Sequence, residues 1–75
     1  MSEEKTVSRK NLTFYKGFSI LDGKLFSGVC VDYHDNGQKK SEGHLKNGEE
    51  DGLWTVWSET GERINEAYFI DGKED

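Results

Sequence analysis

The first candidate for chemistry is the single cysteine, Cys30, which has His34 four residues later and His44 ten residues after that. On a β-strand, residues 30 and 34 would point to the same side, so two metal ligands would be available there. A structural zinc site needs four ligands, however, and the sequence has no second cysteine. We therefore predict no metal site and no cofactor, with Cys30 packed as a thiol and the histidines at the surface.

Cys30 and His34, together with Asp32, also have the residue types of a thiol nucleophile, its base and an orienting carboxylate. On a strand Asp32 would share the face of Cys30 and His34, because side chains two positions apart point to the same side. So small a sheet, however, shows no element that would form a substrate pocket. The interpretation we favour is structural, and no catalytic residue is predicted at this position.

Paired carboxylates are the other arrangement used in acid–base catalysis, and Glu42 and Glu66 are equivalent positions of a repeated pattern. Each precedes a small residue, Gly43 or Ala67, at the same point of that pattern. Repetition explains both glutamates as structural positions. The glycines are spaced by turns and do not form a phosphate-binding loop. The sequence therefore predicts a protein that is not an enzyme.

An aromatic and acidic set of residues is the strongest candidate for binding. Tryptophan and tyrosine dominate the energetic centres of protein interfaces, and acidic neighbours favour a basic protein. The predicted partner-binding residues are Tyr33, Glu49, Glu50, Asp51, Trp54 and Trp57. The structural alternative is that the rings fill the core of a sheet and that the acidic run is a solvated hairpin tip.

The charge of the chain is divided unevenly. The net charge is −5; residues 1–48 carry eight basic and six acidic side chains (+2), and residues 49–75 carry two basic and nine acidic ones (−7). An acidic half argues against a nucleic-acid partner and against an anionic membrane, so we predict neither. It favours a basic protein partner; the alternative is that the charge only keeps a small surface solvated.

Length and cysteine content bound the class of protein. A chain of 75 residues forms one small domain, and it has no apolar run approaching the roughly 18 residues needed to span a bilayer. The charged segment after Met1 is not a signal peptide, and one cysteine permits no internal disulfide. These features favour a cytoplasmic protein, with the earlier removal of a leader as the alternative.

The elements that position these residues are predicted from glycine turns. Four dipeptides have the sequence that type I′ hairpin turns prefer, because both central residues need positive φ, and a fifth is a weaker version of them. They are Asp22-Gly23, Asn36-Gly37, Asn47-Gly48 and Asp71-Gly72, followed by the weaker Thr60-Gly61. The segments between them have the length of ordinary strands.

Alternation along these strands divides the side chains between two faces. Cys30 and Asp32 would share one face with Trp54 and Val56. The residues expected on the opposite face are Val29, Val31, Tyr33, Leu53, Thr55 and Trp57. Because apolar residues occur on both faces, either the sheet curls on itself or a partner covers one face.

The pattern recurs with a constant difference in residue number, which we call the repeat offset and which is 24. Matching positions are Tyr33 with Trp57, Gly37 with Gly61, Glu42 with Glu66, Gly48 with Gly72 and Asp51 with Asp75. We predict a flexible tail over residues 1–10 and one domain over 11–75, which consists of an irregular first unit (11–32) and two repeats (33–56 and 57–75). The predicted fold is all-β, with repeated hairpins forming an open antiparallel sheet.

Four strings in this pattern resemble the bacterial variant of the MORN repeat (membrane occupation and recognition nexus): Tyr33-x-x-Asn36-Gly37-Gln38, Glu42-Gly43, Lys46-Asn47-Gly48 and Asp51-Gly52-Leu53-Trp54. The resemblance covers roughly residues 12–75, although Trp57, Thr60 and Ala67 stand where the pattern has Tyr, Asn and Gly. It implies β-hairpins laid side by side in an elongated, twisted antiparallel sheet, without catalysis. Many short bacterial proteins of this kind are described as antitoxin or immunity proteins, and others in the wider family are linked to membranes and lipids.

The resulting hypothesis is a non-enzymatic protein-binding module of antitoxin or immunity type, which covers a basic or catalytic surface of a partner such as a toxin. The alternative is a structural module that self-assembles, for example as a homodimer, because an open sheet leaves edges and apolar faces to be buried. Association with a membrane surface is a third hypothesis, and the net charge of −5 disfavours it.

Overall fold

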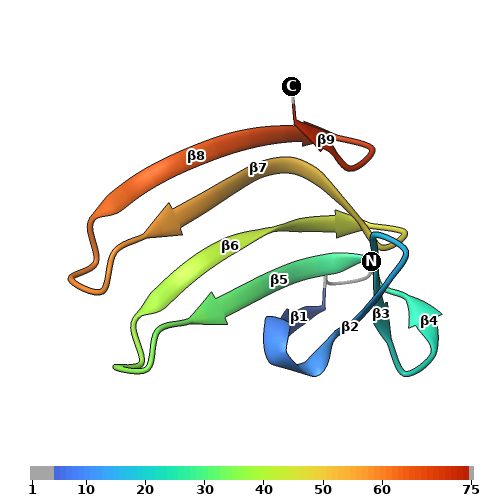
Figure 1. Ribbon diagram of the computed structural model, residues 1–75, viewed down its shortest axis with the longest axis horizontal. Helices are drawn as coiled ribbons and strands as arrows, with labels where there is room; N and C mark the ends of the chain where they lie inside the picture. Colours follow the sequence, from blue (N-terminus) through green and yellow to red (C-terminus); the bar gives the residue numbers. More distant parts are fainter. Residues whose placement is uncertain (1–4, 75) are drawn as a thin grey trace.

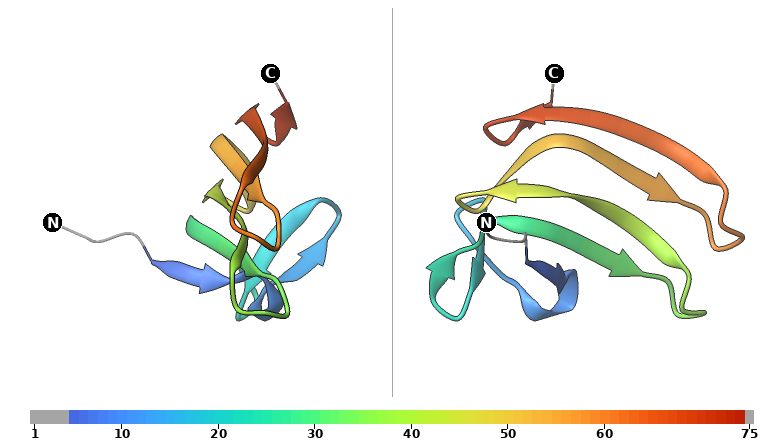
Figure 2. Two further views of the ribbon diagram at one scale, coloured as in Figure 1. Left: turned by 90° about the vertical axis from the view of Figure 1, so that its left-hand side faces the viewer. Right: turned by 180° about the vertical axis from the view of Figure 1, so that it is seen from behind.

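The computed structural model describes residues 5–74, and most of these residues lie in β-strands (Figure 1, Figure 2). Within this range the single helical element is a short 3-10 turn, η1 (Arg9–Asn11). The strands form two sheets, one of six strands and one of three. The all-β prediction is confirmed.

The larger sheet has six strands in the order β1-β5-β6-β7-β8-β9. They are β1 (Thr6–Ser8), β5 (Gly28–Tyr33), β6 (Lys39–Lys46), β7 (Glu49–Trp57), β8 (Arg63–Ile70) and β9 (Lys73–Glu74). From β5 to β9 each strand pairs antiparallel with the next, whereas β1 pairs parallel with β5. The expectation of a purely antiparallel sheet is therefore wrong at this edge. The long connection between β1 and β5 is what allows a parallel pairing.

The smaller sheet lies within that connection. It consists of β2 (Thr13–Tyr15), β3 (Phe18–Leu21) and β4 (Lys24–Leu25), which pair antiparallel in this order. Backbone hydrogen bonds tie it to the turn between β6 and β7: the Ser19 N–H donates to the Gly48 carbonyl, and the Gly48 N–H donates to the Phe26 carbonyl, each at 2.8 Å. The two sheets are thus joined through their backbones as well as through side chains.

The segment predicted to be a flexible tail, residues 1–10, contains β1 and part of η1. Val7 in the middle of β1 is only 9% exposed and lies opposite Cys30 on β5. The prediction is therefore wrong for residues 6–10, and residues 1–4 lie outside the described part. A strand of three residues with one apolar side chain has too short a pattern to be recognised from sequence.

One kind of turn has the predicted type I′ character. At four two-residue turns both residues have positive φ, between 50° and 85°, as this turn requires. They are Lys16-Gly17, Asp22-Gly23, Asn47-Gly48 and Asp71-Gly72. The last three are predicted by their dipeptides, whereas Lys16-Gly17 is not, because lysine rarely adopts positive φ.

The turn at Asn36-Gly37 is of a second kind, so the type I′ prediction is wrong there. Only Gly37 has positive φ (88°). Its N–H donates to the His34 carbonyl at 3.0 Å, and the His34 N–H donates to the Gln38 carbonyl at 2.8 Å. The turn around Gly61 (φ 92°), one repeat offset later, has the same pair of backbone hydrogen bonds. A longer loop with glycine at a bulge therefore closes both hairpins.

The strand register assigns side chains to two faces of the larger sheet. Val31, Glu42, Thr55 and Glu66 are cross-strand neighbours and form a row on one face, which we call the outer face. Cys30, Gly43, Trp54 and Ala67 lie on the opposite face, which we call the core face. The predicted sharing of one face by Val31 and Thr55 is confirmed.

The core face is covered over β5 and β6 by the first part of the chain. The buried cluster consists of Val7, Leu12, Phe26, Cys30 and Leu45, with Leu21 and Trp54 packed against it. On the outer face, by contrast, Tyr33, Leu53 and Tyr68 are about half exposed. The N-terminal segment therefore covers the core face over β5 and β6 only, and apolar side chains remain accessible on the outer face.

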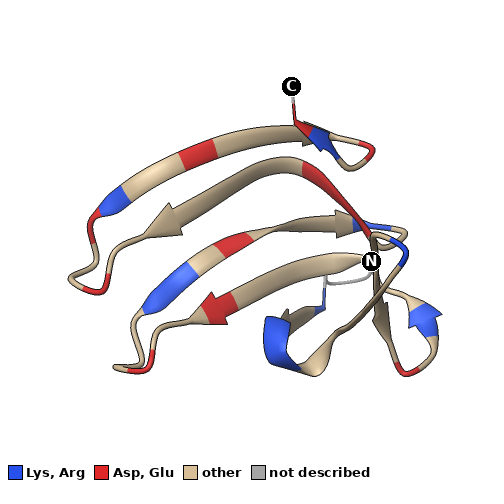
Figure 3. Cartoon of the chain, viewed as in Figure 1, with Lys and Arg blue, Asp and Glu red and all other residues tan. Residues whose placement is uncertain are grey.

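The outline of the molecule is nearly isometric, with extents of 34 × 31 × 27 Å. The molecule as a whole is therefore not elongated, because the smaller sheet folds beside the larger one and does not extend it (Figure 2). Charge follows this division: residues 5–28 carry five basic side chains and one acidic one. Figure 3 shows four of these basic residues on η1, on β4 and in the β2–β3 turn, and a run of acidic residues at the start of β7.

Candidate functional site

Cys30 is a core residue, 2% exposed. Burial raises the pKa of its thiol above the ordinary value, against the opposing charge of Arg9. His34 lies in the β5–β6 turn, where its Nε2–H donates to the Trp57 carbonyl at 2.8 Å. Cys30 and His34 thus engage different neighbours. Among residues 5–74, no three His, Cys, Asp or Glu side chains are grouped closely enough to hold a metal ion.

The raised pKa of Cys30 makes stability depend on pH above about 8.5, the ordinary range of a thiol. In that window the unfolded chain loses the thiol proton while the folded protein retains it, so the free energy of unfolding falls as the pH rises through the folded pKa. We expect the difference in unfolding free energy between wild type and Cys30→Ala to be constant below pH 8 and to shrink above it. Urea unfolding at a series of pH values measures this difference; a difference that stays constant or grows at alkaline pH would contradict the burial of the thiol.

The acidic run before Trp54 is part of β7 and not a hairpin tip, so its members alternate between faces. Glu50 and Trp54 line a groove on the core face, whereas Asp51 lies opposite His44 on β6 and belongs to the outer face. The Glu49 carboxylate lies against the turn residue Gly72. The three acidic residues predicted as one cluster therefore have three different surroundings.

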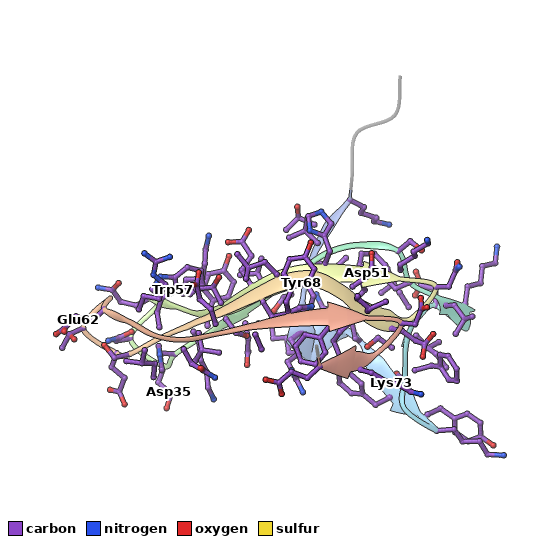
Figure 4. The ribbon with its side chains drawn as sticks, turned by 90° about the horizontal axis from the view of Figure 1, so that it is seen from above. Asp35, Asp51, Trp57, Glu62, Tyr68 and Lys73 are labelled. Atoms are coloured by element: carbon purple, nitrogen blue, oxygen red, sulfur yellow. The ribbon has the colours of Figure 1, made fainter. Side chains whose placement is uncertain are left out.

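Tyr33 and Trp57 lie at the other end of the sheet, next to the β5–β6 and β7–β8 turns (Figure 1). The Lys39 Nζ lies 5.6 Å from the centroid of the Trp57 ring and forms a 2.8 Å ion pair with Glu42. With the sheet viewed edge-on, Figure 4 shows Trp57 on the same side as Asp51. Of the six predicted residues, the structure thus brings only Glu50 and Trp54 together in the groove.

The groove is on the part of the core face formed by β7 and β8, beside the buried cluster. Its volume is about 240 Å³. It is lined by Arg9, Glu50, Trp54, Val56, Asn65, Ala67, Phe69 and Glu74. Rings, aliphatic groups and carboxylates therefore meet in one concave surface, the arrangement that favours an amphipathic basic side chain.

Trp54 is held in place by its neighbours on β6. Its indole lies flat over Gly43, where a Cβ would overlap the ring, and its Nε1–H donates to the His44 carbonyl at 3.0 Å. The Phe69 ring packs against the indole in a T-shaped arrangement, with centroids 6.4 Å apart and an interplanar angle of 76°. The wall of the groove is thus preorganised, because the indole is held by a hydrogen bond and by contacts with Gly43 and Phe69.

The charges in the groove favour a cation. Glu50 and Glu74 contribute two carboxylates, and Arg9 contributes one guanidinium. The Arg9 guanidinium carbon lies 5.0 Å from the centroid of the Phe14 ring, so part of its interaction is directed to that ring. An entering basic group would find two carboxylates beside the Trp54 and Phe69 rings, which also attract cations.

Several groove residues are missing from the sequence-based prediction, and a signal for most of them exists. Ala67 follows Gly43 by one repeat offset, and Phe69 follows the buried Leu45 by the same interval. Alternation along β8 puts Asn65 on the same face as these two residues. The offset and the alternation together would have predicted the floor of the groove. Arg9 has no such signal, because no period marks the N-terminal segment.

A second cavity, of about 250 Å³, lies at the opposite end of the sheet and is lined by Tyr33, His34, Asp35, Lys40 and Glu59. There the Asn36 Nδ2–H donates to the Glu59 carbonyl at 2.9 Å, which links the two neighbouring turns. This cavity is lined almost wholly by polar side chains. The groove is the stronger candidate, because it combines two rings and aliphatic side chains with its carboxylates.

Comparison of the chain with protein-family models, with curated proteins and with solved structures gave no match. Within residues 5–74, no helix has the length and apolar character needed to cross a membrane.

Proposed function

We propose that this protein is a non-enzymatic binding module that receives a basic segment of a protein partner in the groove between β7 and β8. The observation that carries the proposal is the placement of the Trp54 and Phe69 rings beside the carboxylates of Glu50 and Glu74. Aromatic rings give large contact area at low entropic cost, and carboxylates select a basic partner and speed its approach.

We further propose that the chain is built from repeated hairpins of MORN type in a twisted sheet. Two hydrogen bonds separated by one repeat offset support this: the Gly48 N–H donates to the Phe26 carbonyl at 2.8 Å, and the Gly72 N–H donates to the Glu50 carbonyl at 2.9 Å. The matching turns around Gly37 and Gly61 add to this support. In such a cytoplasmic module of antitoxin or immunity type, the groove would cover a basic or catalytic surface of a toxin-like partner.

The proposal predicts that removing the two groove carboxylates weakens binding. A partner captured from the source lysate by the tagged wild-type chain is identified, purified and titrated against Glu50→Gln/Glu74→Gln. We expect the Kd to rise about tenfold, and more steeply at low salt, because two attractions to basic groups are lost. The matched control is Glu59→Gln/Glu62→Gln, which removes the same charge at the other end of the sheet and should change the Kd by less than about twofold.

Equal losses in both double variants would show that net charge and not the groove governs binding. Unchanged affinity in the groove variant would overturn the proposal. Capture of nothing but the chain itself would support the second candidate, a self-assembling module. The observation in favour of that candidate is the exposure of Tyr33, Leu53 and Tyr68 on the outer face, each between 48% and 54% exposed.

A further inference from the structure

Within residues 5–74, the edge of β8 that points away from β7 is largely unpaired. β9 pairs with β8 only at Phe69 and Ile70, so the stretch from Arg63 to Tyr68 has β7 on one side and no strand on the other (Figure 1). Alternate N–H and C=O groups along this stretch point away from the sheet. Their direction makes this edge a template for another strand, and the groove opens on the core face of the same stretch.

The molecule already shows how a strand docks on the equivalent edge. On β6, Lys46 pairs with Glu49 and Leu45 with Glu50; on β8, Ile70 pairs with Lys73 and Phe69 with Glu74. Every residue in the second set follows its counterpart in the first by one repeat offset. β9 therefore begins the pairing that β7 makes with β6 and, within the described residues, carries it over only two pairs.

That pairing also shows where a side chain of an added strand would go. β7 continues along β6 and lays Trp54 over Gly43, with the indole N–H bonded to the His44 carbonyl. Ala67 and Tyr68 are the residues at the corresponding positions of β8. Ala67 is part of the floor of the groove, whose volume of about 240 Å³ accommodates a large side chain.

We propose that an extended segment of the partner pairs antiparallel with β8 from Arg63 to Tyr68 and seats an aromatic side chain over Ala67. A basic residue next to that aromatic one would meet Glu50 and Glu74, which fixes the chemistry of the segment: extended, aromatic and basic. Backbone pairing gives the affinity of this docking, and the groove gives its specificity. The inference rests on the proposed function, because it names how the same groove receives its partner.

The probe is the peptide Lys-Leu-Trp-Thr-Val-Trp-Lys, which places the Leu53–Trp57 sequence of β7 between two lysines. Titration calorimetry measures its affinity, and amide hydrogen exchange by NMR locates its site. We expect slower exchange at residues 63–68 and no change in β5. Replacing the first tryptophan of the peptide by glycine, or methylating alternate backbone nitrogens, should weaken binding by about tenfold or more. Ala67→Gly should strengthen it, because the ring can then lie closer to the sheet.

Binding that is insensitive to backbone methylation, or slower exchange elsewhere than on β8, would overturn the strand-addition model. Protection of residues 63–68 that appears without peptide and rises with protein concentration would overturn it in favour of a second copy at this edge.

The two proposals fail separately. If β8 stays unprotected but Glu50→Gln/Glu74→Gln still lowers the affinity for the captured partner, only strand addition fails. If the peptide binds at β8 but the two substitutions leave the affinity for the captured partner unchanged, only the proposed function fails.

Discussion

Replacing Phe26 by alanine is expected to lower the free energy of unfolding by about 3–5 kcal/mol. Phe26 is 5% exposed and belongs to the buried cluster, where it stands between the smaller sheet and β5. Its removal leaves a cavity between the two sheets, because the backbone hydrogen bonds on both sides of residue 26 limit how far the walls can collapse. The total free energy of unfolding of a domain of this length is only about 4–11 kcal/mol, so the variant would be close to unfolding at room temperature.

Urea unfolding followed by tryptophan fluorescence measures this loss. The matched control is Phe14→Ala, which removes the same side chain from a position that is 51% exposed on the smaller sheet. That variant should lose less than about 1 kcal/mol, since little apolar area returns to water and the contact with the Arg9 guanidinium is worth little at an exposed site. Similar losses in the two variants would contradict a core centred on Phe26.

Gly43→Ala is expected to lower the free energy of unfolding by about 1–3 kcal/mol, although it adds only a single methyl group. Gly43 is not among the glycines with positive φ, so the backbone itself would accept alanine. The cost arises because the new Cβ would overlap the indole of Trp54 and push it off β6. The displaced ring would lose its hydrogen bond to the His44 carbonyl and move into the groove. Partner binding should therefore weaken together with stability.

A double-mutant cycle isolates this contact. In a Trp54→Ala background, Gly43→Ala should cost less than about 0.5 kcal/mol, because nothing then occupies the space over residue 43. Additive losses would show that alanine is resisted by something other than the ring. Denaturant midpoints of the four proteins give the coupling free energy directly.

Elements that depend on neighbouring residues could be predicted from the sequence, whereas elements that depend on distant residues could not. Turns such as Asn47-Gly48 are determined by a dipeptide and its immediate flanks, so both their position and their geometry could be predicted. Asn36-Gly37 contains the same dipeptide, yet its φ pattern depends on how His34 and Gln38 close the loop, which the dipeptide does not encode. β1 depends wholly on a strand far along the chain, and three residues give no pattern from which to predict it.

The candidate site was predictable only where the residues obey the strand period. Trp54 and Glu50 differ by four positions and share a face, so their meeting follows from alternation. Asp51 is adjacent to Glu50 and cannot share that face, so the same alternation separates the acidic residues that were predicted as one cluster. Trp57 is separated from Trp54 by an odd number of positions, and the two rings face opposite sides for the same reason. Arg9 enters the groove from η1, and only the tertiary fold brings it there.

The parallel pairing of β1 with β5 has a consequence for the order in which the chain folds. The β5–β8 hairpins join segments separated by short turns, whereas Val7 must meet Cys30 across η1 and the whole of the smaller sheet. Closing the longer loop costs more entropy and is rewarded only once β5 is in place. During synthesis, therefore, the residues of β1 leave the ribosome before their partner strand and cannot reach their native neighbours until η1, the smaller sheet and β5 have been made.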